Sequence, residues 1–395
     1  MEVLSPSKDD LFQAVREKFF GSFGKKEDVT ILRSPGRINL VGEHTDYNDG
    51  FVLPAAIDRS IDFVISKRKD SKCRLFAADI QDGCEFEVNS PKKSSKRWAN
   101  FLIGIVDQIT KNGYALNGFD CLFGGNIPIG AGLSSSAAIE AGLAFALNEI
   151  FHLGIDRVKL AGIAQKSEHE FVGVMCGIMD QFTNLLAKKD SVIKLDCRSL
   201  DFEYIDFSTN NLSLVLCNSG IRHELANSEY NLRRQECESG INKINSLGYS
   251  VSKLRDVSFD LLESCKSGLD PVVYNRCRYV LEENDRVESA AKAITKHDYK
   301  YLGGILFDSH KGLRDKYNVS CEELDFLVDT ASKIDGVLGA RMMGAGFGGC
   351  TINLIEKDSL PEFKTRIKNE YQKKTGKAPE FYECKIVSGT EIVTG

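Results

Sequence analysis

Apolar and polar positions along the chain follow both a helical and a strand period, so the predicted elements are mixed. Residues 7–21 carry apolar side chains at helical spacing, whereas residues 61–65 alternate partly, as in a strand. The expected helices cover residues 7–21, 98–110, 157–171, 178–187, 227–246, 258–267, 271–294, 322–334 and 360–374, with one more ending near residue 151. The expected strands cover residues 29–33, 51–57, 61–68, 73–78, 117–123, 191–196, 212–217, 351–355 and 381–388. Because the two kinds do not alternate strictly, the predicted fold class is α+β.

The length of the chain predicts two domains. Its 395 residues exceed the roughly 250–300 residues at which a single hydrophobic core stops growing. Residues 200–210 are polar and irregular, which is typical of a boundary. We therefore expect domains over residues 1–205 and 206–395, and leave open whether the last strand returns to the first domain.

Composition excludes several partners and compartments. A net charge of −5 without a Lys/Arg block gives no electrostatic case for nucleic acid or an anionic membrane. The twelve cysteines show no C-x-x-C pair, and the opening MEVLSPSKDD is polar, so we expect no disulfide framework, no secretory signal and a cytoplasmic protein. No apolar run approaches the roughly 18 residues that cross a bilayer.

The run Gly130 to Ala138, GAGLSSSAA, predicts a tight turn before a helix. Glycines allow the backbone to approach a ligand, and the following helix start presents free N–H groups to an anion such as a nucleotide phosphate. Serine hydroxyls there are able to ligate Mg²⁺. A serine-capped helix that binds nothing remains an alternative, since the lysine of the standard P-loop is absent.

A second glycine cluster, Gly344 to Gly349, superficially resembles a dinucleotide fingerprint. A strand rather than a helix is expected after it, so that interpretation fails. It remains either a tight turn between a helix and a strand or a backbone wall that closes on phosphates from the second domain. The existence of the first glycine run favours the wall.

The segment from Ser34 to Asn48 is dense in hydrogen-bonding groups. Glu43, His44 and Asp46 suit sugar hydroxyls, each of which both donates and accepts, and Arg37 suits a phosphate or carboxylate. Ordinary turn chemistry, a surface ion pair, or metal binding by the histidine and aspartate are the alternatives; no other His or Cys has the spacing to support zinc.

An acidic residue at a helix start is a candidate catalytic base. Asp180 follows CGIM and begins the helix expected at 178–187. A carboxylate there is able to deprotonate a hydroxyl, but Asp is also favoured at helix starts by the helix dipole. Residues alone leave both interpretations open.

Together these motifs resemble the GHMP small-molecule kinases and, within them, the galactokinase family. GRINLVGEHTDYNDGFVLP is similar to the galactokinase signature, whereas IPIGAGLSSSAA and MGAGFGGC are similar to motifs shared by the superfamily. EHEFVGVMCGIMDQ, LDCRSL and NSGIRHELANSEYNLRR are also similar to galactokinase segments; Gly220 and Ile221 depart from the residues that relatives often carry.

The resemblance implies a fold and an activity. The fold would be a two-domain GHMP kinase, with an N-terminal domain like domain 2 of ribosomal protein S5, a C-terminal ferredoxin-like domain and the active site between them. The activity would be ATP-dependent, Mg²⁺-requiring phosphorylation of galactose at its anomeric hydroxyl by a monomer. A kinase for N-acetylgalactosamine or arabinose, or a galactose sensor without catalysis, remains an alternative.

The resemblance also implies residue roles. Asp180 would be the catalytic base, and Arg37 would stabilise charge on the transferred phosphoryl group. The sugar would contact Arg37, Glu43, His44, Asp46, Gly177, Asp180 and Tyr230. The ATP phosphates would lie against Gly130, Ala131, Gly132, Leu133, Ser134, Ser135 and Ser136. Ser136 and Glu168 would serve Mg²⁺, and Trp98 would lie near the adenine.

Overall fold

The computed structural model describes residues 8–24, 26, 28–128, 130–208, 211–221 and 226–393. Its helices are α1 (Lys8–Phe23), α2 (Arg97–Lys111), α3 (Ser135–Phe151), α4 (Arg157–Ser167), α5 (Met179–Leu186), α6 (Ala226–Ser246), α7 (Phe259–Ser264), α8 (Pro271–Thr295), α9 (Tyr299–Gly312), α10 (Glu322–Ala331) and α11 (Leu360–Thr375). The strands are β1 (Thr30–Asn39), β2 (Phe51–Val52), β3 (Pro54–Lys67), β4 (Lys72–Ala77), β5 (Asp82–Glu87), β6 (Phe119–Gly125), β7 (Ser191–Asp196), β8 (Phe202–Asp206), β9 (Leu212–Asn218), β10 (Val337–Met342), β11 (Cys350–Glu356), β12 (Glu380–Cys384) and β13 (Glu391–Ile392). Single turns of other helix types are η1 (Asp46–Asn48), η2 (Glu168–Val172), η3 (Leu254–Asp256), η4 (Lys266–Gly268), η5 (Leu313–Tyr317) and η6 (Lys357–Ser359).

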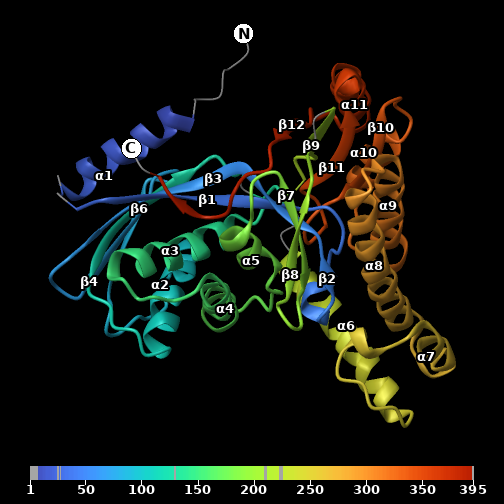
Figure 1. Ribbon diagram of the computed structural model, residues 1–395, viewed down its shortest axis with the longest axis horizontal. Helices are drawn as coiled ribbons and strands as arrows, with labels where there is room; N and C mark the ends of the chain where they lie inside the picture. Colours follow the sequence, from blue (N-terminus) through green and yellow to red (C-terminus); the bar gives the residue numbers. More distant parts are fainter. Residues whose placement is uncertain are drawn as a thin grey trace.

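A six-stranded sheet organises the N-terminal half in the order β13-β1-β3-β6-β4-β5. Helices α2 to α5 cover one face of this sheet and α1 covers the other (Figure 1). Apolar side chains alternate along β3: Phe63 packs in the cluster that includes residues of α2 to α5, whereas Val64 packs with Phe19 of α1. The sheet is therefore covered on both faces. A register shift between Pro35 and Gly36 lets β1 continue to Asn39.

The C-terminal half contains a four-stranded antiparallel sheet in the order β10-β11-β9-β12. Strand β9 leads through helices to the hairpin β10-β11, and α11 then leads to β12. This is the split βαββαβ connection of a ferredoxin-like fold. The predicted α+β class and the ferredoxin-like C-terminal architecture are confirmed. The chain finally returns to the first sheet, where Leu32 of β1 pairs with Ile392 of β13.

The sequence pattern missed five of the helices and strands that the structure describes, namely strands β5, β8, β10 and β13 and helix α9. The second glycine cluster joins two strands rather than a helix and a strand. In β10 the pattern fails because a fully buried arginine, Arg341, occupies a core position. In α9 the apolar pattern fails because a glycine, Gly303, stands at a buried position where an apolar side chain would be expected. A Cβ there would lie 1.9 Å from the carbonyl oxygen of Leu338, so the glycine lets the helix pack directly on β10.

Several expectations need correction only at their ends, and one falls partly outside the described residues. The helix expected at 157–171 ends as α4 at Ser167, and the turn η2 continues it. Residues 222–225 of the NSGIRHELANSEYNLRR segment lie outside the described residues. In the part of the chain that the structure describes, no helix is long and apolar enough to cross a membrane.

Candidate active site

Two adjoining cavities meet at Arg37 and Asp180, which line both. The smaller, of about 140 Å³, contains every residue predicted to hold the sugar. The larger, of about 560 Å³, lies between the two glycine-rich turns. We call them the sugar cavity and the nucleotide cavity. Ala345 of the second turn also lines both, so the two cavities share a wall as well as a polar junction.

The junction is a two-point ion pair. Arg37, near the end of β1, donates from Nε to Oδ1 of Asp180 over 2.7 Å and from Nη2 to Oδ2 over 2.9 Å. Burial alone would lower the pKa of Arg37, but the negative charge of Asp180, with those of Glu43 and Asp46, outweighs it and raises this pKa. The guanidinium therefore stays charged and fixes the plane of the Asp180 carboxylate.

The first glycine turn is tied to the same pair. Arg37 Nη1 donates to the carbonyl oxygen of Gly132 over 2.6 Å, and the Ser134 hydroxyl donates to Asp180 Oδ2. Ser134 has a φ of 55°, in the left-handed region that non-glycine residues seldom adopt. The predicted phosphate turn and the predicted base therefore form one hydrogen-bonded unit.

Asp46 is a buried carboxyl pressed against backbone. It lies in the turn η1, and its Oδ1 accepts from the N–H of Tyr47 over 3.0 Å. Burial, with the nearby charges of Asp180 and Glu43, raises the pKa of Asp46 to about 7. Gly177 packs so closely that a Cβ on it would lie 1.9 Å from Asp46 Oδ2. Because glycine has no Cβ, residue 177 leaves room for the Asp46 carboxyl in the wall of the sugar cavity.

His44 is a neutral imidazole in the sugar cavity. Its Nδ1 lies 2.7 Å from the Tyr47 hydroxyl, and burial lowers the pKa of His44 to about 3. Its Nε2 is buried and makes no hydrogen bond of good geometry among the described residues, although the backbone of Ala345 lies close to the ring. The ring of Tyr230 packs with its centroid 5.4 Å from that of the imidazole. A buried nitrogen without a well-formed hydrogen bond favours a ligand hydroxyl at this point.

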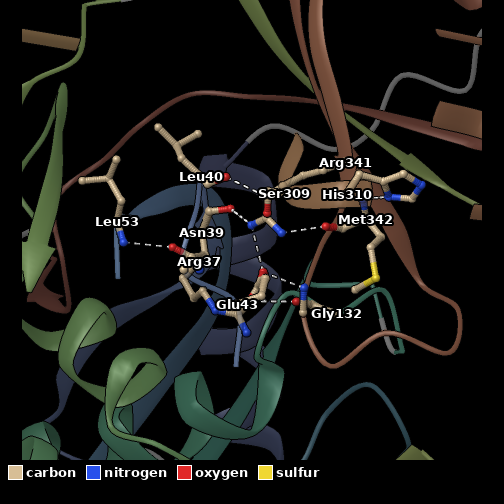
Figure 2. Close-up of polar contacts among 12 residues, drawn as sticks. Arg37, Asn39, Leu40, Glu43, Leu53, Gly132, Ser309, His310, Arg341 and Met342 are labelled. Carbon is tan, nitrogen blue, oxygen red and sulfur yellow. Dashed lines mark hydrogen bonds and ion pairs between the residues drawn. The ribbon is translucent and has the colours of Figure 1, made fainter. Parts of the chain in front are cut away.

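Glu43 is already bound by the protein through one oxygen. Oε1 accepts from Arg341 Nη2 over 3.0 Å and from the N–H of Gly344 over 2.8 Å (Figure 2). Among the described residues, no hydrogen bond reaches Oε2. Sequence reasoning found Glu43 but not Arg341, because 298 positions separate them.

The nucleotide cavity is built by the two glycine turns. Of the residues predicted to hold the ATP phosphates, Gly130, Gly132, Leu133, Ser134, Ser135 and Ser136 line this cavity, whereas the side chain of Ala131 is fully buried in the core. Gly344 has a φ of 80°, and a Cβ on it would lie 3.2 Å from the carbonyl oxygen of Gly132, so a side chain there would be strained and would press on the first turn. This geometry favours the interpretation of the second cluster as a backbone wall.

Arg97 is a residue of the nucleotide cavity that the sequence reasoning missed. It begins α2 next to Trp98, and its side chain is exposed. Trp98 itself donates from Nε1 to Asp82 over 2.9 Å and is not among the residues that line the cavity. Nothing in the sequence distinguished Arg97 from the other cations of the preceding loop, PKKSSKR.

The predicted magnesium ligands lie on two sides of the junction. Ser136 lines the nucleotide cavity, and Glu168 lines the sugar cavity, where Gln181 Nε2 donates to its Oε2 over 2.9 Å. Glu140 is fully buried beside Glu168, and burial, together with the neighbouring charge of Glu168, raises the pKa of Glu140. Burial raises the pKa of Glu168 to about 7. Hydroxyl and carboxylate oxygens suit a hard cation, which nucleotide phosphates would help to ligate.

This fold and site define a small-molecule kinase of the GHMP superfamily. The GHMP kinases N terminal domain matches residues 100–188, and the GHMP kinases C terminal domain matches residues 290–373. A mevalonate kinase structure shares the fold, with a TM-score of 0.63 at 18% identity over 91% of this chain and 99% of that one.

The chain is also similar to galactokinases in particular. The galactokinase galactose-binding signature matches residues 17–67. The chain is 42% identical to galactokinase of Clostridium tetani (strain Massachusetts / E88), covering 90% of this chain and 92% of that protein. It is 39% identical to galactokinase of Roseiflexus sp. (strain RS-1), covering 95% of each. The crystal structure of Lactococcus lactis galactokinase complexed with galactose matches with a TM-score of 0.93 at 34% identity, over 97% of this chain and all of that one. The chain belongs to the galactokinase family.

Proposed function

We propose that this kinase transfers the γ-phosphoryl group of ATP to the anomeric hydroxyl of galactose, giving galactose 1-phosphate and ADP. The observation that carries the proposal is the Arg37–Asp180 pair at the junction of the two cavities. A hydroxyl in the sugar cavity and a phosphate in the nucleotide cavity would meet at this pair. Phosphoryl transfer requires just such positioning together with charge stabilisation.

Each partner of the pair has a defined task. Asp180 accepts the proton of the anomeric hydroxyl as that oxygen bonds to the γ-phosphorus and the bond from phosphorus to the ADP oxygen breaks. Arg37 holds the carboxylate in place and stabilises the charge that develops on the transferred group. Ser134 shares Asp180 Oδ2 in the free enzyme, so its hydroxyl is positioned to turn to a phosphate oxygen when the nucleotide binds.

The sugar would be held by the remaining polar groups of the small cavity. Glu43 Oε2, His44 Nε2 and Asp46 are the groups with hydrogen-bonding capacity to offer. Gly177 shapes the wall and Tyr230 closes it beside the imidazole.

Ser136 and Glu168 would hold Mg²⁺ together with phosphate oxygens. The cation would neutralise charge on the β- and γ-phosphates. Because burial raises the pKa of Glu168, a cation bound there would favour the ionised carboxylate and would compete with its proton.

A sugar panel tests the proposal. Release of ADP is measured with galactose, N-acetylgalactosamine, arabinose and glucose, with and without EDTA. Turnover is expected with galactose and is expected to disappear with EDTA. Failure with galactose but turnover with another sugar would reassign the substrate; sugar binding without any turnover would indicate a sensor. The variant Asp180→Asn should lower kcat by about 10²–10⁴-fold while the protein still binds ATP.

The domain boundaries, the oligomeric state and the cellular location are three further predictions. Residues 1–205 and 206–395 are proposed as the two domains, with β13 added to the sheet of the first. A monomer and a cytoplasmic location are proposed as well, and sedimentation and cell fractionation would test them.

A further inference from the structure

The segment that carries the sugar-binding residues is held in shape from the C-terminal half of the chain. After β1 ends at Asn39, the N–H of Leu40 and the carbonyl of Val41 still pair with Leu53, and the next residues contact side chains of α8 and β10. Gly42 adopts a φ of 101°, and a Cβ on it would lie 2.7 Å from the carbonyl oxygen of Phe51. The N–H of Gly42 and the carbonyl oxygens of Asn39 and Leu40 are instead bound by side chains from the C-terminal half, which satisfies these buried polar groups.

Arg341 of β10 supplies the first set of contacts. Its side chain is fully buried, and it donates from Nε to the carbonyl oxygen of Leu40 over 2.6 Å. Its Nη2 donates to the carbonyl oxygen of Asn39 and to Glu43 Oε1 (Figure 2). One planar group therefore fixes two consecutive carbonyls and the carboxylate that follows them. A lysine ammonium has no such fork.

Glu283 of α8 supplies the second set. It is fully buried, and its Oε1 accepts from the N–H of Gly42 over 2.9 Å and from the Ser309 hydroxyl over 2.7 Å. Its Oε2 accepts from Arg286 over 2.6 Å. Burial alone would raise the pKa of Glu283, but the charges of Arg286 and Arg341 outweigh it and lower this pKa. The ionised carboxylate of Glu283 therefore binds the segment at Gly42, while Arg341 binds it before this residue, at Asn39 and Leu40, and after it, at Glu43.

These contacts decide how Glu43 meets a ligand. Arg341 and the N–H of Gly344 both donate to Oε1, which orients the carboxylate plane and leaves Oε2 for the cavity. Without Arg341 the carboxylate would lose its orientation, and the carbonyls of Asn39 and Leu40 would be buried without a donor.

We propose that Arg341 is a positioning residue for the sugar, acting through Glu43 and the main chain of residues 39–40, with Glu283 supporting the same segment at Gly42. This inference rests on the proposed function, because the sugar is the ligand that Glu43 would contact. The C-terminal half would then shape the sugar cavity as well as closing the nucleotide cavity.

The test compares Arg341→Lys and Arg341→Met with wild type. Galactose binding without nucleotide and ATP binding without sugar are measured by calorimetry, beside steady-state KM and kcat and the melting temperature. The loss of charged hydrogen bonds should weaken galactose about 10-fold or more in the methionine variant, with the lysine variant between it and wild type. The change in ATP affinity should stay below about 3-fold, since Arg341 does not line the nucleotide cavity.

Asp120→Asn is the control for a purely structural effect. Asp120 is also fully buried and accepts from Arg74 and Arg68, but it lies on β6 and lines neither cavity. This variant should melt at a lower temperature with unchanged galactose affinity. If Arg341→Lys behaves in the same way, or weakens ATP and galactose by equal factors, the positioning role is wrong.

Two further measurements keep the outcome decisive. If Arg341→Met does not fold, the lysine variant and Glu283→Gln carry the test; an amide is still able to accept from Gly42 but has no charge, so galactose should weaken by only a few fold. In a double-mutant cycle, the effects of Glu43→Gln and Arg341→Lys on galactose binding should be less than additive, because one acts through the other. Additive effects would overturn the inference.

The same measurements separate this inference from the proposed function. If wild type turns over galactose and the Arg341 variants bind it normally, only the inference fails. If wild type prefers another sugar, the variants are compared with that sugar and the inference is judged on its binding. If wild type binds no sugar, both fail.

Discussion

Arg37 and Asp180 form a two-point ion pair, with Nε 2.7 Å from Oδ1 and Nη2 2.9 Å from Oδ2. Arg37 comes from a strand and Asp180 from the first turn of α5, 143 positions later. Both cavities and the first glycine turn meet at this pair. From this geometry we propose that residues at the junction serve the transfer step and that residues on the sugar side alone serve sugar binding.

Arg37→Ala should therefore act mainly on kcat. Removal of a preorganised cation from the transferred group should lower kcat by about 10²–10³-fold, with a smaller rise in the KM for galactose. Asp46→Ala should instead raise the KM for galactose, since Asp46 lines only the sugar side of the junction. Steady-state kinetics with each substrate varied in turn would check both. Equal effects of the two variants on one parameter would count against this division of roles.

How much of this site could be predicted from the sequence depends on the distance between partners. Glu43, His44 and Asp46 fall within four residues, so the sequence alone predicted that they lie close together. The sequence predicted that both glycine-rich segments form tight turns, but it did not show that the two turns face each other across one cavity. The resemblance to a family supplied the link to Asp180, since residue chemistry alone left it as an ordinary helix-start acid.

Arg341 shows why the rest was not predictable. A buried arginine in a strand breaks the apolar pattern that identifies strands, so β10 was missed along with its function. Its partners are main-chain carbonyls, which carry no sequence signal. Likewise, Arg37 was placed between strands, whereas a bulge at Pro35 and Gly36 lets β1 include it.

Gly177→Ala should damage sugar binding through Asp46. The added Cβ would overlap Asp46 Oδ2, at 1.9 Å, so the carboxyl must move. The KM for galactose should rise about 10-fold, with kcat changed less. Gly162→Ala on α4 is the matched control, because a Cβ there meets nothing within 4 Å. This control should keep wild-type kinetics and gain up to about 1 kcal/mol of helix stability. Similar kinetics in both variants would show that Gly177 has no packing role at the site.

Arg97→Met should weaken ATP without affecting galactose. Arg97 is a cationic side chain that lines only the nucleotide cavity. Loss of an exposed cation near a polyanion should raise the KM for ATP by roughly 3–10-fold at low ionic strength, and less at high salt. Arg16→Met on α1 provides a control of equal charge change away from both cavities. An unchanged KM for ATP at low salt would remove Arg97 from the nucleotide site.

Asp46→Asn should bind sugar more weakly than wild type but should be more stable, and the gain in stability should depend on pH. Burial raises the pKa of Asp46 from 3.8 to about 7, so the folded chain binds this proton more tightly than the unfolded chain does. Between these two values the folded chain holds more protons, and stability therefore falls as pH rises; above about pH 7 the whole cost is present.

The cost of ionising Asp46 should be about 2–4 kcal/mol above pH 7, and an uncharged isostere avoids it. Asp46→Asn should accordingly melt a few degrees above wild type at pH 8 and at nearly the same temperature near pH 4, where Asp46 is protonated in the folded chain and about half protonated in the unfolded chain. Its KM for galactose should rise at least several-fold, because an amide is a weaker acceptor than a carboxylate. Melting curves at pH 4 to 8, without sugar, would measure the first effect. A melting difference that stays constant across this range would show that Asp46 ionises in the folded chain at its ordinary pKa.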